Sequence, residues 1–230
     1  MDHALTRQQA SAAVDDLGWR LLLGSLRASV VVGSLAQAAD AAVRMVAACA
    51  DHADAHLRLD VRADRVVATL QSPEQAWVTG RDVDCARRIS AALGQAGLRA
   101  TPEVATEGAR SVQLLEIAVD CTDAASVRPF WKAVLGYADE PQAAGPDAPL
   151  VDPVGQGPAV WFQQMDPPRT QRNRIHVDVS VPHDEAPGRV EAALASGGRL
   201  VSAAHAPAFW VLADVEGNEV CVTTWQGREG

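Results

Sequence analysis

The sequence predicts an α+β protein whose two halves are built differently. In the first hundred residues, segments with helix and strand character alternate as helix, two strands, helix, two strands, helix. That order predicts an antiparallel sheet with helices packed on one face. In the second half, a strand, a helix, a turn and a further strand occur twice, which indicates an internal duplication. With 230 residues, 48% of them apolar, the chain has room for one or two domains, and we expect two.

Capping boxes predict the helices of the first half. In a capping box a hydroxyl covers a free backbone N–H and the residue three positions later reaches back. Thr6 with Gln9, Ser34 with Gln37 and Thr79 with Asp82 have this spacing. Each pair precedes a run with apolar residues at helical spacing, so we expect helices over residues 6–17, 34–50 and 79–96.

The segments between these helices have strand character, and a polar stretch follows the last helix. Strands are expected over residues 19–23, 28–32, 56–61 and 66–71. The stretch RATPEVATEGAR lacks periodicity and contains Pro and Gly, which is typical of a linker. We therefore expect a first domain over residues 1–98, a linker over 99–110 and a second domain over 111–230.

The duplication in the second half is visible at four matching points. LLEIAVDCTD (114–123) has the shape of RIHVDVSVPHD (174–184), and each leads into a helix, over 124–135 and 185–196. Later, an Asp-x-x-Gly turn followed by a strand occurs in both halves of the repeat, within 150–165 and 212–225. Four matches in the same order indicate a duplicated structural unit.

Composition excludes several classes of partner. A formal net charge of −9 argues against nucleic acid, which requires clustered Lys and Arg. The four cysteines are far apart and form no CxxC motif, so we expect reduced thiols. The N-terminus lacks a basic segment followed by an apolar one, and Arg27 and Arg44 interrupt the most apolar early region. These features predict a cytoplasmic protein with no membrane partner.

Four segments of the second half resemble the glyoxalase/bleomycin-resistance superfamily, also called the vicinal-oxygen-chelate superfamily. They are FWKAVLGY (130–137), WFQQM (161–165), NRIHVDV (173–179) and DVEGNEVCV (214–222). The resemblance spans residues 111–226 and implies a duplicated βαβββ domain. In that superfamily, two modules surround a cleft that binds a divalent metal or a metal-free ligand, so a small-molecule partner is expected.

The resemblance implies four ligand positions for a divalent metal: Glu116 and His176 on the first strands of the modules, and Gln163 and Cys221 on later strands. The superfamily usually has Glu where Cys221 stands, and a thiolate would shift the preference towards zinc. This departure favours a ligand-binding or metal-free site over a metal site. In the alternative, Glu116 and His176 hydrogen-bond each other or a ligand inside an otherwise apolar cleft.

Aromatic and basic residues complete the predicted cleft. Strand alternation places Trp161 on the face of Gln163, and a pocket lined by Trp161 and Trp210 would suit a planar small molecule. The alternative is that both indoles fill core space. Arg174 belongs to the basic run DPPRTQRNR (166–174), which would attract an anionic substrate at the cleft mouth or serve as a solvated connector.

The first half resembles the pterin-4a-carbinolamine dehydratase family over about residues 4–98. The matching segments are DHADAHLRLDV (51–61), RVVATLQS (65–72) and WVTGRDVDCARRI (77–89). The family removes water from a 4a-hydroxytetrahydropterin with three histidines that supply acid and base. By the resemblance, its paired histidines and the following proline fall on Asp51, His52 and Ala53, and its third histidine falls on Pro73.

Only His52 survives in this interpretation, because His56 is assigned to the start of the next strand. We therefore expect a small-molecule-binding or small-molecule-transforming glyoxalase-like protein, a lyase or isomerase if it is an enzyme, fused to a dehydratase-like domain that has lost its activity. A first alternative is an active dehydratase that uses His52 with Asp51 as the acid and base. A second is a non-enzymatic binding module that forms homodimers.

Overall fold

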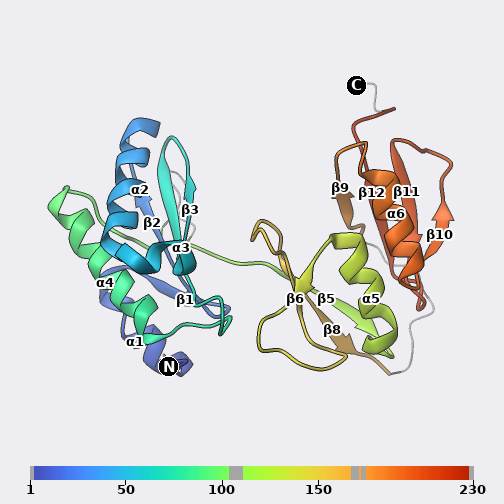
Figure 1. Ribbon diagram of the computed structural model, residues 1–230, viewed down its shortest axis with the longest axis horizontal. Helices are drawn as coiled ribbons and strands as arrows, with labels where there is room; N and C mark the ends of the chain where they lie inside the picture. The colour runs from blue at the N-terminus through green and yellow to red at the C-terminus, as the bar shows by residue number, and fades with distance from the viewer. Residues whose placement is uncertain (1–2, 104–110, 167–170, 172–174, 228–230) are drawn as a thin grey trace. The chain divides into compact units, whose positions relative to one another are not determined.

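The chain forms two compact units, Met1–Leu114 and Leu115–Gly230. The computed structural model describes residues 3–103, 111–166, 171 and 175–227. Each unit encloses its own cluster of buried apolar side chains, and both combine helices with sheets (Figure 1). The α+β class expected from the sequence is confirmed.

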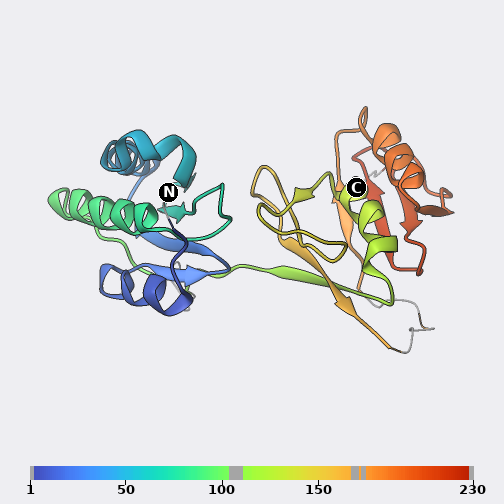
Figure 2. The same ribbon diagram turned by 60° about the horizontal axis from the view of Figure 1, so that its bottom comes forward.

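The first unit is a four-stranded antiparallel sheet with strand order β1-β2-β4-β3. Its strands are β1 (Arg20–Leu22), β2 (Ser25–Val31), β3 (Leu57–Val61) and β4 (Arg65–Leu70). The long helices α2 (Leu35–Cys49) and α4 (Gly80–Gln95) pack against each other on one side of this sheet (Figures 1 and 2). The short helices are α1 (Arg7–Ala12), η1 (Asp15–Leu17), η2 (Ala50–His52) and α3 (Ala53–His56).

The predicted capping residues start helices α1 and α2. Thr6 and Gln9 form a reciprocal capping box at α1, and Ser34 accepts a hydrogen bond from the Gln37 N–H at α2. The helix expected over 6–17 is divided, because α1 ends at Ala12 and a 3₁₀ turn follows. Gly18 closes that turn with φ of 81°, a left-handed conformation that glycine adopts without steric cost.

Strand alternation separates a core face from an outer face in the first sheet. Leu26, Ala28 and Val30 of β2 point into the core and are at most 1% exposed. The intervening residues, including Arg27 and Ser29, therefore lie on the face away from the core.

Part of the expected linker is attached to the first unit. The Thr101 N–H donates to the Ser29 carbonyl at 2.8 Å, and the Ser29 N–H donates to the Thr101 carbonyl at 2.7 Å. The Val112 N–H likewise donates to the Pro102 carbonyl at 2.8 Å. Residues 104–110 lie outside the described part of the chain.

The second unit contains two four-stranded sheets of the same topology, in the orders β5-β8-β7-β6 and β9-β12-β11-β10. In each sheet the first strand pairs in parallel with the last, β5 with β8 and β9 with β12. The strands are β5 (Glu116–Cys121), β6 (Ala138–Asp139), β7 (Leu150–Val151), β8 (Ala159–Gln164), β9 (Asp178–Ser180), β10 (Arg199–Ser202), β11 (Phe209–Ala213) and β12 (Glu219–Thr223). The predicted duplication is confirmed at the level of strand order.

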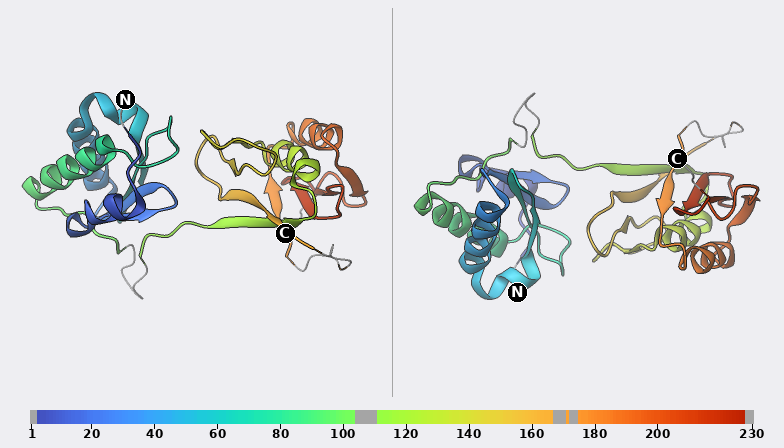
Figure 3. Two further views of the ribbon diagram at one scale, coloured as in Figure 1. Left: turned by 90° about the horizontal axis from the view of Figure 1, so that it is seen from below. Right: turned by 90° about the horizontal axis from the view of Figure 1, so that it is seen from above.

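The helices and turns of the second unit are repeated in the same way as its strands. Helices α5 (Ala124–Leu135) and α6 (Ala186–Ala195) lie side by side (Figures 1 and 3). In each Asp-x-x-Gly turn the aspartate accepts backbone N–H groups, from three donors at Asp152 and from two at Asp214. In the described residues, no helix has the length and apolar character needed to cross a membrane.

Candidate functional site

A buried histidine–aspartate pair lies in the first unit. His56 Nδ1 is 2.8 Å from Asp82 Oδ1, and the two residues are 7% and 0% exposed. An ionised carboxylate can only accept hydrogen bonds, so the His56 Nδ1–H is the donor. When the ring is neutral, the other ring nitrogen, Nε2, therefore carries the free lone pair.

Asp82 is itself held by the start of helix α4. Its Oδ2 accepts from the Thr79 N–H at 2.7 Å and from the Thr79 hydroxyl at 2.9 Å. The capping box predicted from the spacing of Thr79 and Asp82 is therefore confirmed. The spacing gave no sign that the remaining oxygen of Asp82 would orient a histidine 26 residues earlier.

A second histidine stands beside this pair. His52, half-buried on η2, has its ring centroid 5.8 Å from that of His56, with the ring planes at 68°. Sequence reasoning placed His56 at the start of a strand, and this was wrong: His56 ends helix α3, and β3 begins at Leu57. The short helix turns His56 towards α4, where it meets Asp82, and His52 lies beside His56.

The other predicted positions of the first unit lie at the surface. Asp51 is exposed on η2, and no described contact joins it to His56 or Asp82. Pro73 is exposed in the turn that follows β4, and it has no ionisable group. The structure thus groups His52 with His56 and Asp82, and Asp51 lies outside this group. The acid and base roles expected of His52 and Asp51 stay a prediction.

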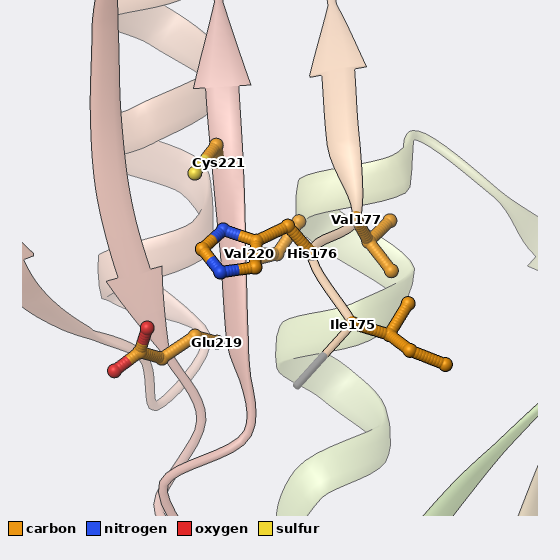
Figure 4. Close-up of a pocket in the computed structure, with 6 residues that line it drawn as sticks. All are labelled: Ile175, His176, Val177, Glu219, Val220 and Cys221. Carbon is orange, nitrogen blue, oxygen red and sulfur yellow. The ribbon is translucent and has the colours of Figure 1, made fainter. Parts of the chain in front are cut away.

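The second unit has a shallow pocket around His176. Its space of about 220 Å³ includes the solvent at its mouth, and it is lined by Ile175, His176, Val177, Glu219, Val220 and Cys221. The His176 ring extends towards β12 between the side chains of Glu219 and Cys221, while Ile175 and Val177 point away from it (Figure 4). The structure therefore brings together two of the four predicted ligand positions, His176 and Cys221.

Strand register explains this grouping. Cys221 pairs with Asp178 in the parallel ladder of β9 and β12, and the Cys221 N–H donates to the Val177 carbonyl at 2.9 Å. Alternate residues of β12 share a face, so Glu219 and Cys221 lie on one side while Val220 and Val222 enter the core. Glu219 was not predicted, because the resemblance implied a ligand position only at Cys221 on this strand.

Glu116 and Gln163 lie on the other sheet of the unit. Both are exposed, at positions that share one face of the β5–β8 ladder with half-buried Trp161. They do not line the His176 pocket. Glu116 instead influences Glu140, whose pKa is raised above its ordinary value by burial and then by the negative charge of Glu116.

One predicted contributor to the cleft, Trp210, lies against the hydrophobic core instead. Trp210 pairs with Val222 across β11 and β12, which places it on the face opposite Cys221, against the hydrophobic core. The alternative that this indole fills core space is therefore the correct one. Arg174 lies outside the described residues.

The predicted metal ligands do not converge in the described structure. In residues 3–103, 111–166, 171 and 175–227, no group of three or more His, Cys, Asp or Glu side chains could hold a metal ion. His176 and Cys221 share a pocket, whereas Glu116 and Gln163 are on a separate sheet. The described residues do not fit a divalent metal ion, which was the less favoured possibility in the sequence prediction.

Two families match different parts of the chain. Residues 3–92 match the family described as pterin 4 alpha carbinolamine dehydratase, and residues 116–223 match the family described as glyoxalase-like domain. Through its first unit the chain belongs to the pterin-4-alpha-carbinolamine dehydratase family, and its second unit is a glyoxalase-like domain.

Two bacterial proteins named "Putative pterin-4-alpha-carbinolamine dehydratase" are similar to the first unit. The protein from Mycobacterium avium (strain 104) is 38% identical over 91 residues, which cover 39% of this chain and 96% of that protein. The protein from Mycolicibacterium vanbaalenii is also 38% identical over 91 residues, with 39% and 97% covered.

Solved structures are similar to parts of the chain. A glyoxalase/bleomycin resistance protein/dioxygenase family enzyme from Burkholderia phytofirmans PsJN has 16% identity and a TM-score of 0.40, covering 47% of this chain and 95% of its own. A transcriptional coactivator/pterin dehydratase from Brucella melitensis has 24% identity and a TM-score of 0.36, covering 39% and 98%.

Proposed function

We propose that the first unit dehydrates a 4a-hydroxytetrahydropterin by acid–base catalysis at His52 and His56. The observation that carries the proposal is the buried hydrogen bond between His56 and Asp82, with the ring of His52 beside it. The family match supplies the reaction class.

The reaction needs an acid that protonates the departing hydroxyl and a base that removes a proton from the ring. The bond between ring carbon C4a and its hydroxyl breaks, the hydroxyl leaves as water after receiving a proton, and the adjacent ring nitrogen loses its proton. Asp82 holds the Nδ1–H of His56, which leaves Nε2 to accept the ring proton. The half-exposed His52 supplies the proton to the departing hydroxyl.

Pro73 limits this proposal. It stands where the family resemblance implies a third histidine and supplies no proton. A positioned acid or base contributes roughly 10²–10⁴-fold to a rate. We therefore expect dehydration above the uncatalysed background but slower than a site with three histidines would give.

The test is the rate of dehydration of a 4a-hydroxytetrahydropterin by the full chain and by His52→Ala. We expect a fall of roughly 10²-fold or more in the variant. The matched control is His205→Ala, an exposed histidine stacked on Phe209 in the second unit, which should leave the rate unchanged. A wild-type rate no higher than the uncatalysed background would end the proposal.

A second function is proposed for the second unit, which we infer binds a small organic molecule on the face that carries His176. The supporting observation is the shallow pocket lined by His176, Glu219 and Cys221. An imidazole and a carboxylate beside aliphatic side chains are typical of a site that orients a ligand by a few polar contacts.

This second proposal is tested by thermal unfolding with a panel of aromatic carboxylates and amides. We expect at least one compound to raise the melting temperature of the wild-type chain and to lose that effect in His176→Ala. Glu191→Ala, an exposed change on α6, should keep the shift. If His176→Ala retained every shift, the pocket would not be the binding site.

A further inference from the structure

Two arginines face each other across the outer face of the first sheet. Arg27 on β2 and Arg58 on β3 are both paired with Thr69 on β4, so the three residues form one row across three neighbouring strands. Neighbouring strands are about 4.8 Å apart, which puts the Cα atoms of the two arginines about 10 Å apart. Side chains in one row of a sheet project from the same face.

Within the described part of the chain, no carboxylate pairs with either of these two arginines. In the residues that the structure describes, neither guanidinium has a carboxylate within ion-pair distance, and Arg58 donates only to the amide oxygen of Gln71, at 3.1 Å. The Nε of Arg27 is buried and has no hydrogen-bond partner. By contrast, Arg20 in the same row pairs with Asp15 at 2.9 Å.

A buried hydroxyl on the same face also lacks a partner. Ser29 lies two residues beyond Arg27 on β2 and is 0% exposed, and its Oγ makes no hydrogen bond. Thr69, between the two arginines, is 5% exposed. Unsatisfied buried polar groups cost free energy, so their presence beside two unmatched charges calls for a ligand that satisfies them.

The protein surroundings also disfavour the two charges. Desolvation lowers the pKa of Arg27 below its ordinary value, and the positive charge of Arg58 lowers it further. Desolvation lowers the pKa of Arg58 as well. An anion between the two guanidinium groups would offset both effects, because an opposite charge favours the charged form.

We propose that Arg27 and Arg58 form an anion-binding site for the phosphate or carboxylate group of a small molecule, over Thr69 and beside Ser29. Guanidinium groups suit this role because their planar N–H donors match two oxygens of a phosphate or carboxylate. This site is separate from His52, His56 and Asp82, and it does not depend on the proposed dehydration.

The test uses titration calorimetry of the full chain with inorganic phosphate at constant ionic strength. We expect saturable binding that weakens at least about tenfold in Arg27→Gln and in Arg58→Gln, since a hydrogen bond to a charged group contributes about that much. Arg44→Gln is the matched control, because it removes the same charge from an exposed position on α2 and should bind as the wild type does. Phenyl phosphate and benzoate, titrated in parallel, distinguish a phosphate site from a carboxylate site.

Thermal unfolding gives a second readout that protects the test from misfolded variants. Without phosphate, both arginine variants should melt at or above the wild-type temperature, because each removes an unmatched charge. Phosphate should raise the melting temperature of the wild type and of Arg44→Gln only. The proposal is overturned if the wild type binds none of phosphate, phenyl phosphate and benzoate, or if Arg44→Gln weakens binding as much as Arg27→Gln does.

Discussion

At the scale of single residues, Asp82 has two roles in the first unit. One carboxylate oxygen caps helix α4 through Thr79, and the other holds the imidazole of His56. Both roles belong to one carboxylate that is 0% exposed. The position of a candidate catalytic histidine is therefore coupled to the stability of a helix.

We predict that Asp82→Asn lowers the free energy of unfolding by about 1.5–3 kcal/mol, the contribution of hydrogen bonds to a charged group. The amide can accept from Thr79 only with its oxygen and would have to donate to His56 with its NH2, so the bond to His56 is lost or His56 is forced into the opposite tautomer. Urea denaturation measures the change. Asp84→Asn, on the exposed side of α4 where Asp84 pairs with Arg87, should change it by less than about 1 kcal/mol. Equal effects of the two variants would contradict the assigned roles.

Glu140 gives a prediction about pH. Its folded pKa is raised by burial and by the charge of Glu116, so the folded state favours the protonated form. Its contribution to stability is present below the pKa of the unfolded state and is lost as pH rises through the higher folded pKa. Glu140→Gln should therefore be more stable than the wild type at pH 7 and equal to it near pH 3. Unfolding curves at both pH values, with Glu191→Gln as the exposed control, check this.

At the scale of elements, a turn in the second half of the duplicated domain bonds to the start of the helix in the first half. Among the described residues, the first half makes no equivalent contact through its own turn. The carboxylate of Glu216, in the second Asp-x-x-Gly turn, accepts from the N–H groups of Thr122 and Asp123 at the start of α5, at 2.7–2.9 Å. In the first turn the equivalent position is Val154, which is 72% exposed. The duplication has thus become asymmetric at this contact.

We predict that Glu216→Ala lowers the free energy of unfolding by about 0.5–2 kcal/mol, the usual cost of removing a helix cap. Chemical denaturation followed by far-UV circular dichroism measures it. Glu191→Ala, which removes a carboxylate from the exposed face of α6, should cost much less. A loss of the same size in both variants would show that the cap adds nothing.

Some elements can be predicted from the sequence more accurately than others. The helix expected over residues 124–135 has those bounds in the structure, because its signals are local: Asp123 caps its start, and Gly136 ends it with φ of 69°. Trp210 was misplaced because the face of a strand residue depends on its register with a neighbouring strand. His56 was missed because its partner, Asp82, is distant in the sequence and meets it only after folding.

At the scale of the whole molecule, two separate cores imply two separate unfolding events. Leu26 is 0% exposed in the core of the first unit, and Phe130 is 0% exposed in that of the second. A domain with its own core can unfold on its own. The homodimer expected from the sequence stays a prediction, and light scattering over a range of concentrations tests it.

We predict that Leu26→Ala lowers the stability of one calorimetric transition by about 2–5 kcal/mol and leaves the other unchanged. Phe130→Ala should do the reverse, because the cavity it creates lies in the other core. Differential scanning calorimetry of the full chain checks both variants. A single transition that shifts in both would mean that the two units unfold together.

The central claim is that His52 and His56 form one acid–base site in the first unit, and a double-mutant cycle on the dehydration rate tests it most directly. We predict that His52→Ala and His56→Ala each lower kcat/KM by roughly 10²-fold or more, and that the double variant is no slower than the slower single variant. The account is contradicted if His56→Ala leaves the rate unchanged, or if the two losses multiply as they would for independent groups.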